Sequence, residues 1–548
     1  MLQGDKRCCG LKKAEVSDQK AGPSLRHYCS AELGGADRFY SREYIDALSD
    51  YVLLEMFETY LGKDDTVGIN YDHNYDGWQT LVQVCRRWRC IVFASPRRLD
   101  LKLYFTRQRP VNPKMLDIWP ALPIVIAAED MTSKEDATNI IAALRQYNRV
   151  CKIYYRDGQF QDSLLKEFAA IDEPFPALTS LELLSSRQQN VPALPNSFLG
   201  GSAPRLQSLL LSGIPYPSIG KLLSSTTNLV RLSLWHIPHS GYIAPEMLVP
   251  CLSMLPRLES LLLEFQYPRS RADRESRHLP PLTRIISPNL TTLRFGGDIE
   301  YMEDMLSQIE APKLNQIDLC IFNQLTFDTP LLGYFIHRTG TFKTIHRARV
   351  QFFSSAAVVV TLSGREETGN NDRETLRLKI SCKPLDWQLS AVVQVLNSFL
   401  SSLPRLESLE ITVFHKGWQG EIDVVQWRDF LHLFTSVKAM TLVREDSIQL
   451  VSSAFQELAG ESTTEVLPAL QNLILRTYGW RPSGPVKEAI EQFITARQFY
   501  GQPVTVDYWA PKGRGTCVGM PVVGTKTPLL RDIYFSPWSF CWRSDRTR

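Results

Sequence analysis

The sequence has few cysteines and no surplus of charge of either sign. Its 11 cysteines are scattered over 548 residues with no pair of CxxC motifs, so neither a zinc ribbon nor a disulfide framework is expected. Lys and Arg number 61 against 58 Asp and Glu, a formal net charge of +3, which gives no global argument for nucleic-acid binding. This composition favours an intracellular protein with reduced thiols, cytoplasmic or nuclear.

Long apolar runs are also missing. The first 20 residues, MLQGDKRCCGLKKAEVSDQK, lack the apolar core of a secretory signal, and the longest apolar stretches, such as Leu122 to Ala128, are too short to span a bilayer. We therefore expect no membrane partner. Residues 1–44 are polar and aperiodic, which predicts a disordered leader; palmitoylation of Cys8 and Cys9 is the less favoured interpretation.

Catalytic and cofactor motifs are missing as well. The chain contains no HExxH, GxSxG, GxxxxGK[ST] or GxGxxG motif. His236 and His239 lie close in sequence, but Pro238 separates them and no cysteine or carboxylate pair accompanies them, which disfavours a metal site. A hydrolase is disfavoured because no nucleophile–base motif can be named. We expect a binding protein that is not an enzyme and has no cofactor.

What the sequence does contain is an internal repeat. Leucine-like residues recur at positions p, p+3 and p+5, as in APRLQSLLL with Leu206, Leu209 and Leu211. Successive starts are 23 to 33 residues apart, at or just above the period of leucine-rich repeats. Strong copies start at Leu178, Leu206, Leu229, Leu258, Leu290, Leu314, Leu406 and Leu470; weaker ones start at Ile345, Thr375 and Val437, and a degenerate one at Asn148.

This repeat predicts a fold. Positions p+3 and p+5 lie two apart on a short strand, so both point to one buried face, and stacked units share a continuous core. Helical patterns separate the strands at 219–223, 245–254, 302–309 and 389–403. The prediction is an α/β leucine-rich-repeat solenoid over 175–510, with parallel strands on its concave face and helices or irregular segments on its convex face. Residues 98–174 are expected to be a strand–helix linker or N-terminal capping repeats, and residues 511–548 a disordered tail.

Two helices are expected before the repeats. The first spans Ser49 to Leu61, capped by Ser49 or Asp50, and the second runs from Trp78 to about Phe93. Two short helices bury little surface alone, so their apolar stripes need a partner or the rest of the chain.

The sequence around these helices resembles an F-box, from Ile45 to Phe57 and then through the run VCRRWR that begins at Val84. Ser49 stands where that family usually has proline, and the segment 62–77 is longer than usual. Residues 45 to about 510 also resemble the F-box proteins with degenerate leucine-rich repeats that are abundant in mushroom-forming fungi. The runs WQTLVQVCRRWRCIVFASPRRLDLKL (from Trp78), GSAPRLQSLLL (from Gly201) and STTEVLPALQNLIL (from Ser462) carry this resemblance.

The resemblance implies a substrate receptor. F-box helices, here an F-box-like module over 45–97, dock onto an Skp-type adaptor that joins a cullin-RING ubiquitin ligase, while the repeats hold a target protein for ubiquitination. The alternative is that the same apolar residues pack on one another and on the first repeat. The residues assigned to the adaptor are Leu48, Val52, Leu53, Met56, Phe57, Leu81, Val84, Cys85 and Trp88.

A target-binding surface is predicted on the concave side, at positions p+2 and p+4. Neighbouring strands lie about 4.8 Å apart, so residues in the same row become neighbours. On that basis Arg347, Arg349, Arg377 and Lys379 form a compact basic square, with Arg294 nearby beyond Asp318. Such a square suits an acidic or phosphorylated segment of a target whose identity the sequence does not give. The alternative is that these are solvated strand residues.

Two other function classes remain open. The chain could be a protein-binding scaffold without a link to a ubiquitin ligase. Nucleic-acid binding through the basic run Arg86 to Arg98 is disfavoured, because that run lacks interleaved aromatic residues and the net charge is low, so no nucleic-acid partner is expected.

Overall fold

The computed structural model describes most of the chain, in two compact units. The described residues are 47–62, 77–106, 116, 121–129, 134–157, 170–185, 191–266, 284–322, 326–353, 357–365, 372–381, 385–400, 403, 405–414, 424–457, 465–477 and 480–509. The expected leader (1–44) and tail (511–548) lie outside them. A helical unit comprises the described residues up to Leu99, and a sheet unit begins at Asp100.

Among its described residues, the helical unit contains α2 (Asp50–Leu61), α3 (Gly77–Val84) and α4 (Arg86–Ala94). Ser49 caps α2, because its hydroxyl accepts the Val52 N–H at 3.3 Å, and the helix ends at Gly62, whose φ of 65° a glycine adopts without strain. The expected single helix from Trp78 to Phe93 is wrong. Cys85 is extended, and its sulfur accepts the Trp88 N–H at 3.4 Å, so it ends α3 and caps α4.

A small aromatic and aliphatic core holds these helices together. Leu53 and Phe57 from α2 are 0% and 2% exposed. The Phe57 ring lies 4.7 Å from that of Trp88 on α4, and Trp78 meets Phe93 at 6.1 Å between ring centroids. The unit therefore folds around its own core.

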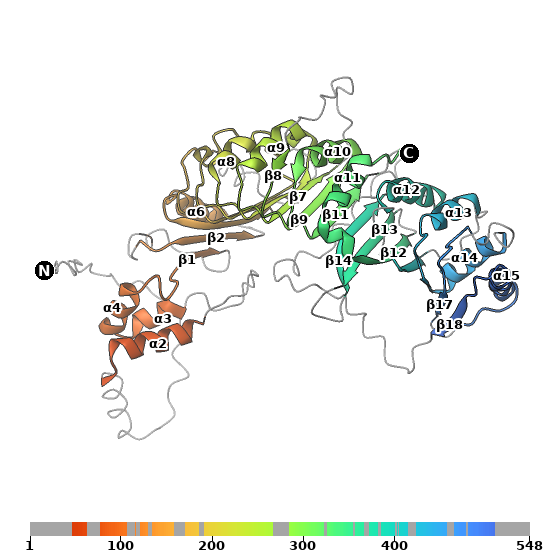
Figure 1. The fold of residues 1–548 in the computed structure, drawn as a ribbon. Helices are drawn as coiled ribbons and strands as arrows, with labels where there is room; N and C mark the ends of the chain where they lie inside the picture. The colour runs from red at the N-terminus through yellow and green to blue at the C-terminus, as the bar shows by residue number, and fades with distance from the viewer. Residues whose placement is uncertain are drawn as a thin grey trace, which may run out of the picture. The chain divides into compact units, whose positions relative to one another are not determined.

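The sheet unit contains a sheet of 16 strands with helices beside it (Figure 1). It also contains a two-stranded sheet of β8 (Ile285–Ile286) and β10 (Ile309–Glu310). Each of the eight strong repeats forms a strand that begins two residues after its first leucine, as predicted. These strands are β4 (Ser180–Ser185), β5 (Ser208–Ser212), β6 (Arg231–Ile237), β7 (Ser260–Phe265), β9 (Thr292–Gly297), β11 (Gln316–Ile321), β15 (Ser408–Phe414) and β17 (Asn472–Arg476). The other parallel strands of the 16-stranded sheet are β1 (Leu103–Thr106), β2 (Ile124–Glu129), β3 (Val150–Asp157), β16 (Ala439–Val443) and β18 (Thr505–Trp509).

The register places repeat positions in rows across this sheet. Leu209 pairs with Leu232 and Leu211 with Leu234, and all four are at most 3% exposed. The residues between them on each strand are half-buried or exposed. Positions p+3 and p+5 are thus buried, and p+2 and p+4 occupy the opposite side of the sheet, which we call the open face.

Helices connect the strands and lie along one side of the sheet (Figure 1). Helices occur at all four predicted places: α8 (Ile219–Ser225), α9 (Pro245–Ser253), α10 (Ile299–Gln308) and α12 (Leu385–Asn397). Further helices in the described part of this unit are α6 (Lys134–Leu144), α11 (Pro330–Arg338), α13 (Val424–His432), α14 (Glu445–Glu457) and α15 (Pro485–Phe499). The fold is therefore mixed α/β with a large, mostly parallel sheet.

The parallel order is interrupted by an antiparallel meander. It consists of β12 (Ile345–Phe353), β13 (Ala357–Arg365) and β14 (Asp372–Ile380), with β14 beside β11 and β12 beside β15. The weak repeats at Ile345 and Thr375 were expected on adjacent parallel strands in chain order. That expectation is wrong, because β13 lies between them and the two strands appear in reversed order.

Helix α11, which precedes the meander, is held at two places. The buried Glu303 on α10 accepts the N–H groups of Leu331 and Leu332 at 2.7 and 2.8 Å, so a carboxylate caps the first turn of α11. Gly333 allows a close approach, since a Cβ there would lie 2.2 Å from the carbonyl oxygen of Ser398. Burial raises the pKa of Glu303 to about 7, an effect partly offset by the two N–H donors.

A buried arginine orders the loop that precedes strand β17. Arg497 on α15 is 0% exposed and donates to the carbonyl oxygens of Val466, Pro468 and Leu470 at 3.2 to 3.4 Å. Burial lowers its pKa. The guanidinium group fixes the turn at Leu467, which has a φ of 51°, just before strand β17.

Candidate protein-binding surfaces

The nine residues assigned to an adaptor do not form one surface. Leu53, Phe57 and Leu81 are at most 5% exposed and belong to the core of the helical unit. Leu48 and Trp88 are half-buried. Val52, Met56 and Val84 are 40%, 50% and 56% exposed, and Cys85 is exposed too. Six of the nine residues, the four exposed and the two half-buried ones, are therefore accessible to a partner.

The exposed residues of α2 form a stripe. Val52, Met56 and Tyr60 follow one another at four-residue spacing, and each is at least 40% exposed. We call these three residues the apolar stripe. Hydrophobic side chains in a row on a small unit are a feature of surfaces that bind another protein.

Two arginines fix α2 against the following segments. Arg87 donates to the Asp50 carboxylate at 2.7 Å and to the carbonyl of Leu48, which joins the beginnings of α2 and α4. Arg98 pairs with Glu55 and Glu58, on another side of α2. The Arg87 guanidinium group, from α4, therefore contacts the start of α2.

On the open face of the sheet, the predicted basic square does not exist. The register pairs Arg377 with Thr361 and Thr361 with Arg349, so strand β13 separates the two pairs of cations. Arg347 and Arg349 lie on β12, while Arg377 and Lys379 lie on β14 next to β11. The reason is the meander, which the repeat pattern does not reveal.

Arg347 and Arg349 belong instead to a cluster around Glu410, which comes from the adjacent strand β15. The carboxylate of Glu410 lies 2.7 Å from Arg347 Nη2, 2.8 Å from Arg349 Nε and 4.0 Å from Nη1 of Arg476 on β17. Only 8% of the Glu410 side chain is exposed, against 28%, 37% and 36% of the three arginines. We call these four residues the Glu410 cluster.

A pair of aromatic residues lies further along the same strands. Phe353 on β12 and Phe414 on β15 are register partners whose rings stack at 4.8 Å with an interplanar angle of 8°. Both are half-buried. The Arg444 guanidinium lies 5.2 Å from the centre of the Phe414 ring and 3.9 Å from Asp446. Arg444 has a φ of 77°, an uncommon value for a residue with a side chain.

The cations on the far side of β13 have acidic neighbours. Asp318 lies between Arg294 and Arg377 in one row of the sheet. Lys379 acts electrostatically on Glu264, whose pKa burial raises to about 7. The Glu264 carboxylate is also 3.6 Å from His236 Nε2. Burial lowers the pKa of His236, which leaves the imidazole neutral at pH 7.

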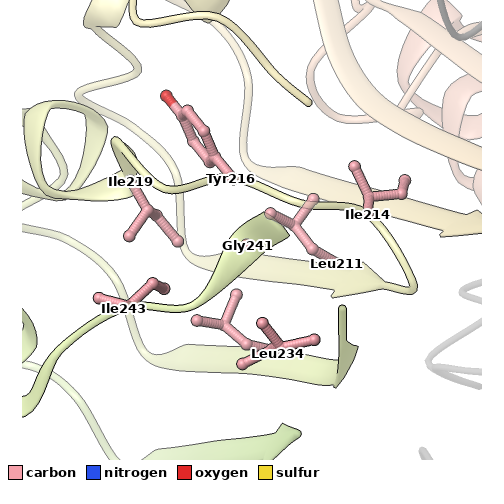
Figure 2. Close-up of a pocket in the computed structure, with 8 residues that line it drawn as sticks. Leu211, Ile214, Tyr216, Ile219, Leu234, Gly241 and Ile243 are labelled. Atoms are coloured by element: carbon pink, nitrogen blue, oxygen red, sulfur yellow. The ribbon is translucent and has the colours of Figure 1, made fainter. Parts of the chain in front are cut away.

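The described part of the chain has a small apolar cavity and, along α15, a shallow open hollow lined by residues such as Glu488, Glu491 and Phe499. The cavity, lined mainly by side chains of β5, β6 and the segments that follow them, measures about 10 Å³, room for no more than one water molecule. Leu211, Leu234 and Ile243 are among its walls, and Figure 2 shows the Tyr216 hydroxyl directed away from these side chains. No group of three or more His, Cys, Asp or Glu able to hold a metal occurs among the described residues. Within the same residues, no helix is long and apolar enough to cross a membrane.

Sequence reasoning placed Glu410 on the open face but did not identify its role, and it missed Arg476, Arg444 and the Phe353–Phe414 pair. The repeat rows carried a signal for part of this cluster, because Glu410 follows Arg349 by two repeats at the same position. Because β12 and β15 are adjacent in the sheet, this shared position makes Arg349 and Glu410 direct neighbours.

Comparisons with known proteins found little. No protein-family model matches the chain, and no curated protein matches it. Among solved structures, the leucine-rich-repeat-containing protein LegL7 from Legionella pneumophila is similar, with 14% sequence identity and a TM-score of 0.25. The match covers 62% of this chain and 97% of that chain.

Proposed function

We propose that the chain is the target-binding subunit of an Skp-cullin-F-box type ubiquitin ligase. In this proposal the helical unit docks on an Skp-type adaptor, and the open face of the sheet holds a target protein. The adaptor and the cullin-RING enzyme would supply the catalysis, and this chain would supply none.

The observation that supports the docking role is the apolar stripe. The unit has its own buried core, so Val52, Met56 and Tyr60 are not needed to hold α2 in place, and yet they are exposed. Burying apolar area releases about 25 cal/mol per Å², so a row of three such side chains is a substantial source of binding energy. Helix packing on a partner helix uses side chains at this spacing.

The open face supports the target-binding role. It carries rows of polar and charged side chains on strands that share a rigid hydrogen-bonded sheet. Side chains fixed on a sheet lose little conformational freedom on binding, which favours recognition of a protein surface.

The test is co-purification of the full chain with an Skp-type adaptor. Val52→Asp with Met56→Asp places two charges on the apolar stripe and should abolish the complex. Substituting Leu53 or Phe57 would not serve, because these residues are buried and their loss would unfold the unit. The matched control, Thr80→Asp with Gln83→Asp, adds the same charges at exposed polar positions of α3 and should retain the adaptor.

Two outcomes would contradict the docking proposal. One is no adaptor complex with the folded wild-type chain, and the other is equal retention of the adaptor by both double variants. In the first case the protein-binding scaffold without a ubiquitin ligase becomes the better description.

A further inference from the structure

We propose that the Glu410 cluster and the Phe353–Phe414 pair together bind an extended acidic segment of a partner protein. The arginines would bind a group carrying two negative charges, and the stacked phenylalanines would accept an aromatic side chain of the same segment. This inference rests on the proposed target-binding role of the open face and specifies the chemistry of the target.

The first argument is that the arginines are held in place before any ligand arrives. Three guanidinium groups converge on one carboxylate at 2.7, 2.8 and 4.0 Å, and that carboxylate is almost fully buried. Each arginine still exposes about a third of its side chain. A long side chain that is already fixed loses less entropy on binding, so the cluster is preorganised for an anion.

The second argument is charge. The Glu410 cluster combines three cations with one anion, so its four side chains carry a net charge of +2. A phosphate monoester, with a charge of about −1.5 to −2 at neutral pH, complements this cluster, as do two adjacent carboxylates. The shared chemistry is a doubly negative group bound by guanidinium N–H donors.

The third argument is distance along the strands. Glu410 and Phe414 lie four positions apart on β15, which corresponds to about 13 Å in a strand. An extended peptide that runs along the strands covers the same distance in four residues. The ligand should therefore carry its aromatic side chain four residues away from its anionic group.

Arg444 adds a reason to place a ligand at the aromatic pair. Its left-handed φ of 77° is unfavourable for an arginine, and the Arg444 N–H bonds to the Arg476 carbonyl at 3.0 Å, which maintains the turn. This backbone brings a cation over the Phe414 ring, next to the strand that carries Arg476 of the Glu410 cluster. The strained residue thus joins the aromatic pair to the arginines in one surface.

The test uses the full chain and fluorescein-labelled peptides, with binding followed by fluorescence anisotropy. The first peptide has phosphoserine, three glycine or serine spacers, and then phenylalanine. Three other peptides each differ from the first in one feature. In one, two aspartates replace phosphoserine; in the second, serine replaces it; in the third, phenylalanine lies two residues closer to phosphoserine. We expect binding of the phosphoserine or the aspartate peptide, at least tenfold weaker binding of the serine peptide, and several-fold weaker binding when the spacing is shortened.

Two variants and one control locate the site. Arg349→Ala with Arg476→Ala should weaken binding at least tenfold, and Phe414→Ala should weaken it only for peptides that contain phenylalanine. The control, Arg294→Ala with Arg377→Ala, removes two cations from the other side of β13 and should leave binding within twofold of wild type. Circular dichroism and thermal unfolding confirm that each variant is folded.

The results separate the possible sources of the anion and the possible failures. Preference for the phosphoserine peptide identifies a phosphorylated segment, and preference for the aspartate peptide identifies an acidic one. Failure of the wild-type chain to bind either peptide overturns the inference, and so does equal binding by the Arg349/Arg476 variant. These measurements need no adaptor, so their failure is distinct from a failure of adaptor docking.

Discussion

Replacing Phe57 by alanine should unfold the helical unit and leave the sheet intact. Phe57 is 2% exposed and its ring centroid lies 4.7 Å from that of Trp88, so the substitution leaves a cavity that costs about 3–5 kcal/mol. At about 0.05–0.15 kcal/mol per residue, a unit of about 40 described residues has roughly 2–6 kcal/mol of stability. The loss is therefore comparable to the whole stability of the unit.

Native-state hydrogen exchange read by mass spectrometry can measure the two units separately. A loss of about 3 kcal/mol corresponds to roughly a hundredfold faster exchange of amides such as that of Leu53, which bonds to the Ser49 carbonyl. Peptides from the sheet should keep their protection. The control is Met56→Ala on the same helix, which removes a half-exposed side chain and should change stability by no more than about 0.5 kcal/mol. Protection of α2 within threefold of wild type in Phe57→Ala would refute the assigned core.

Three further substitutions test other parts of the fold. Because the pKa of Glu303 is raised to about 7, the folded state binds the Glu303 proton more tightly than the unfolded state does. The free energy of unfolding should therefore fall by at most about 3 kcal/mol as the pH rises from 4.5 to 7. Glu303→Gln should flatten this part of the curve measured by urea unfolding, and an unchanged slope would contradict the assignment. Arg497→Leu leaves three carbonyl groups without their donor and should cost roughly 3 kcal/mol, seen as faster exchange in β17; unchanged exchange there would show that these bonds contribute little. Gly333→Ala forces α11 away from Ser398 and should lower the melting temperature by several degrees, whereas an unaltered value would mean that the two segments separate easily.

The sequence predicted the strands of the strong repeats well, for a physical reason. Leucines two residues apart, such as Leu209 and Leu211, can share a buried face only in an extended segment, so the pattern constrains both the strand and its orientation. The pattern is local and says nothing about which strand lies beside which. The run AVVVTLSG of β13 has no repeat signature, and its residues are buried on both faces of the sheet. Because this strand was not predicted, the row of cations drawn from Arg347 to Lys379 was wrong.

The helical unit shows the same limit. Periodicity identified the apolar positions of α2 but did not tell which of them face the core. Leu53 and Phe57 lie inside, and Val52 and Met56 lie outside, because Trp88 packs against one side of the helix only. The break between α3 and α4 at Cys85 was not predicted, because no proline or glycine occurs there and a cysteine sulfur is an uncommon helix cap.

The meander also changes how the chain must fold. In the regular part of the sheet, neighbouring residues are close in sequence, as for Leu209 and Leu232, so each strand can add to the one before it. On either side of the meander, the pairs Ile317–Leu376 and Arg347–Ser408 join residues about 60 positions apart. Closing these longer loops costs more entropy before any pairing is gained. The two parallel arrays should therefore form as separate folding segments, with assembly of β12, β13 and β14 as the slow step that joins them.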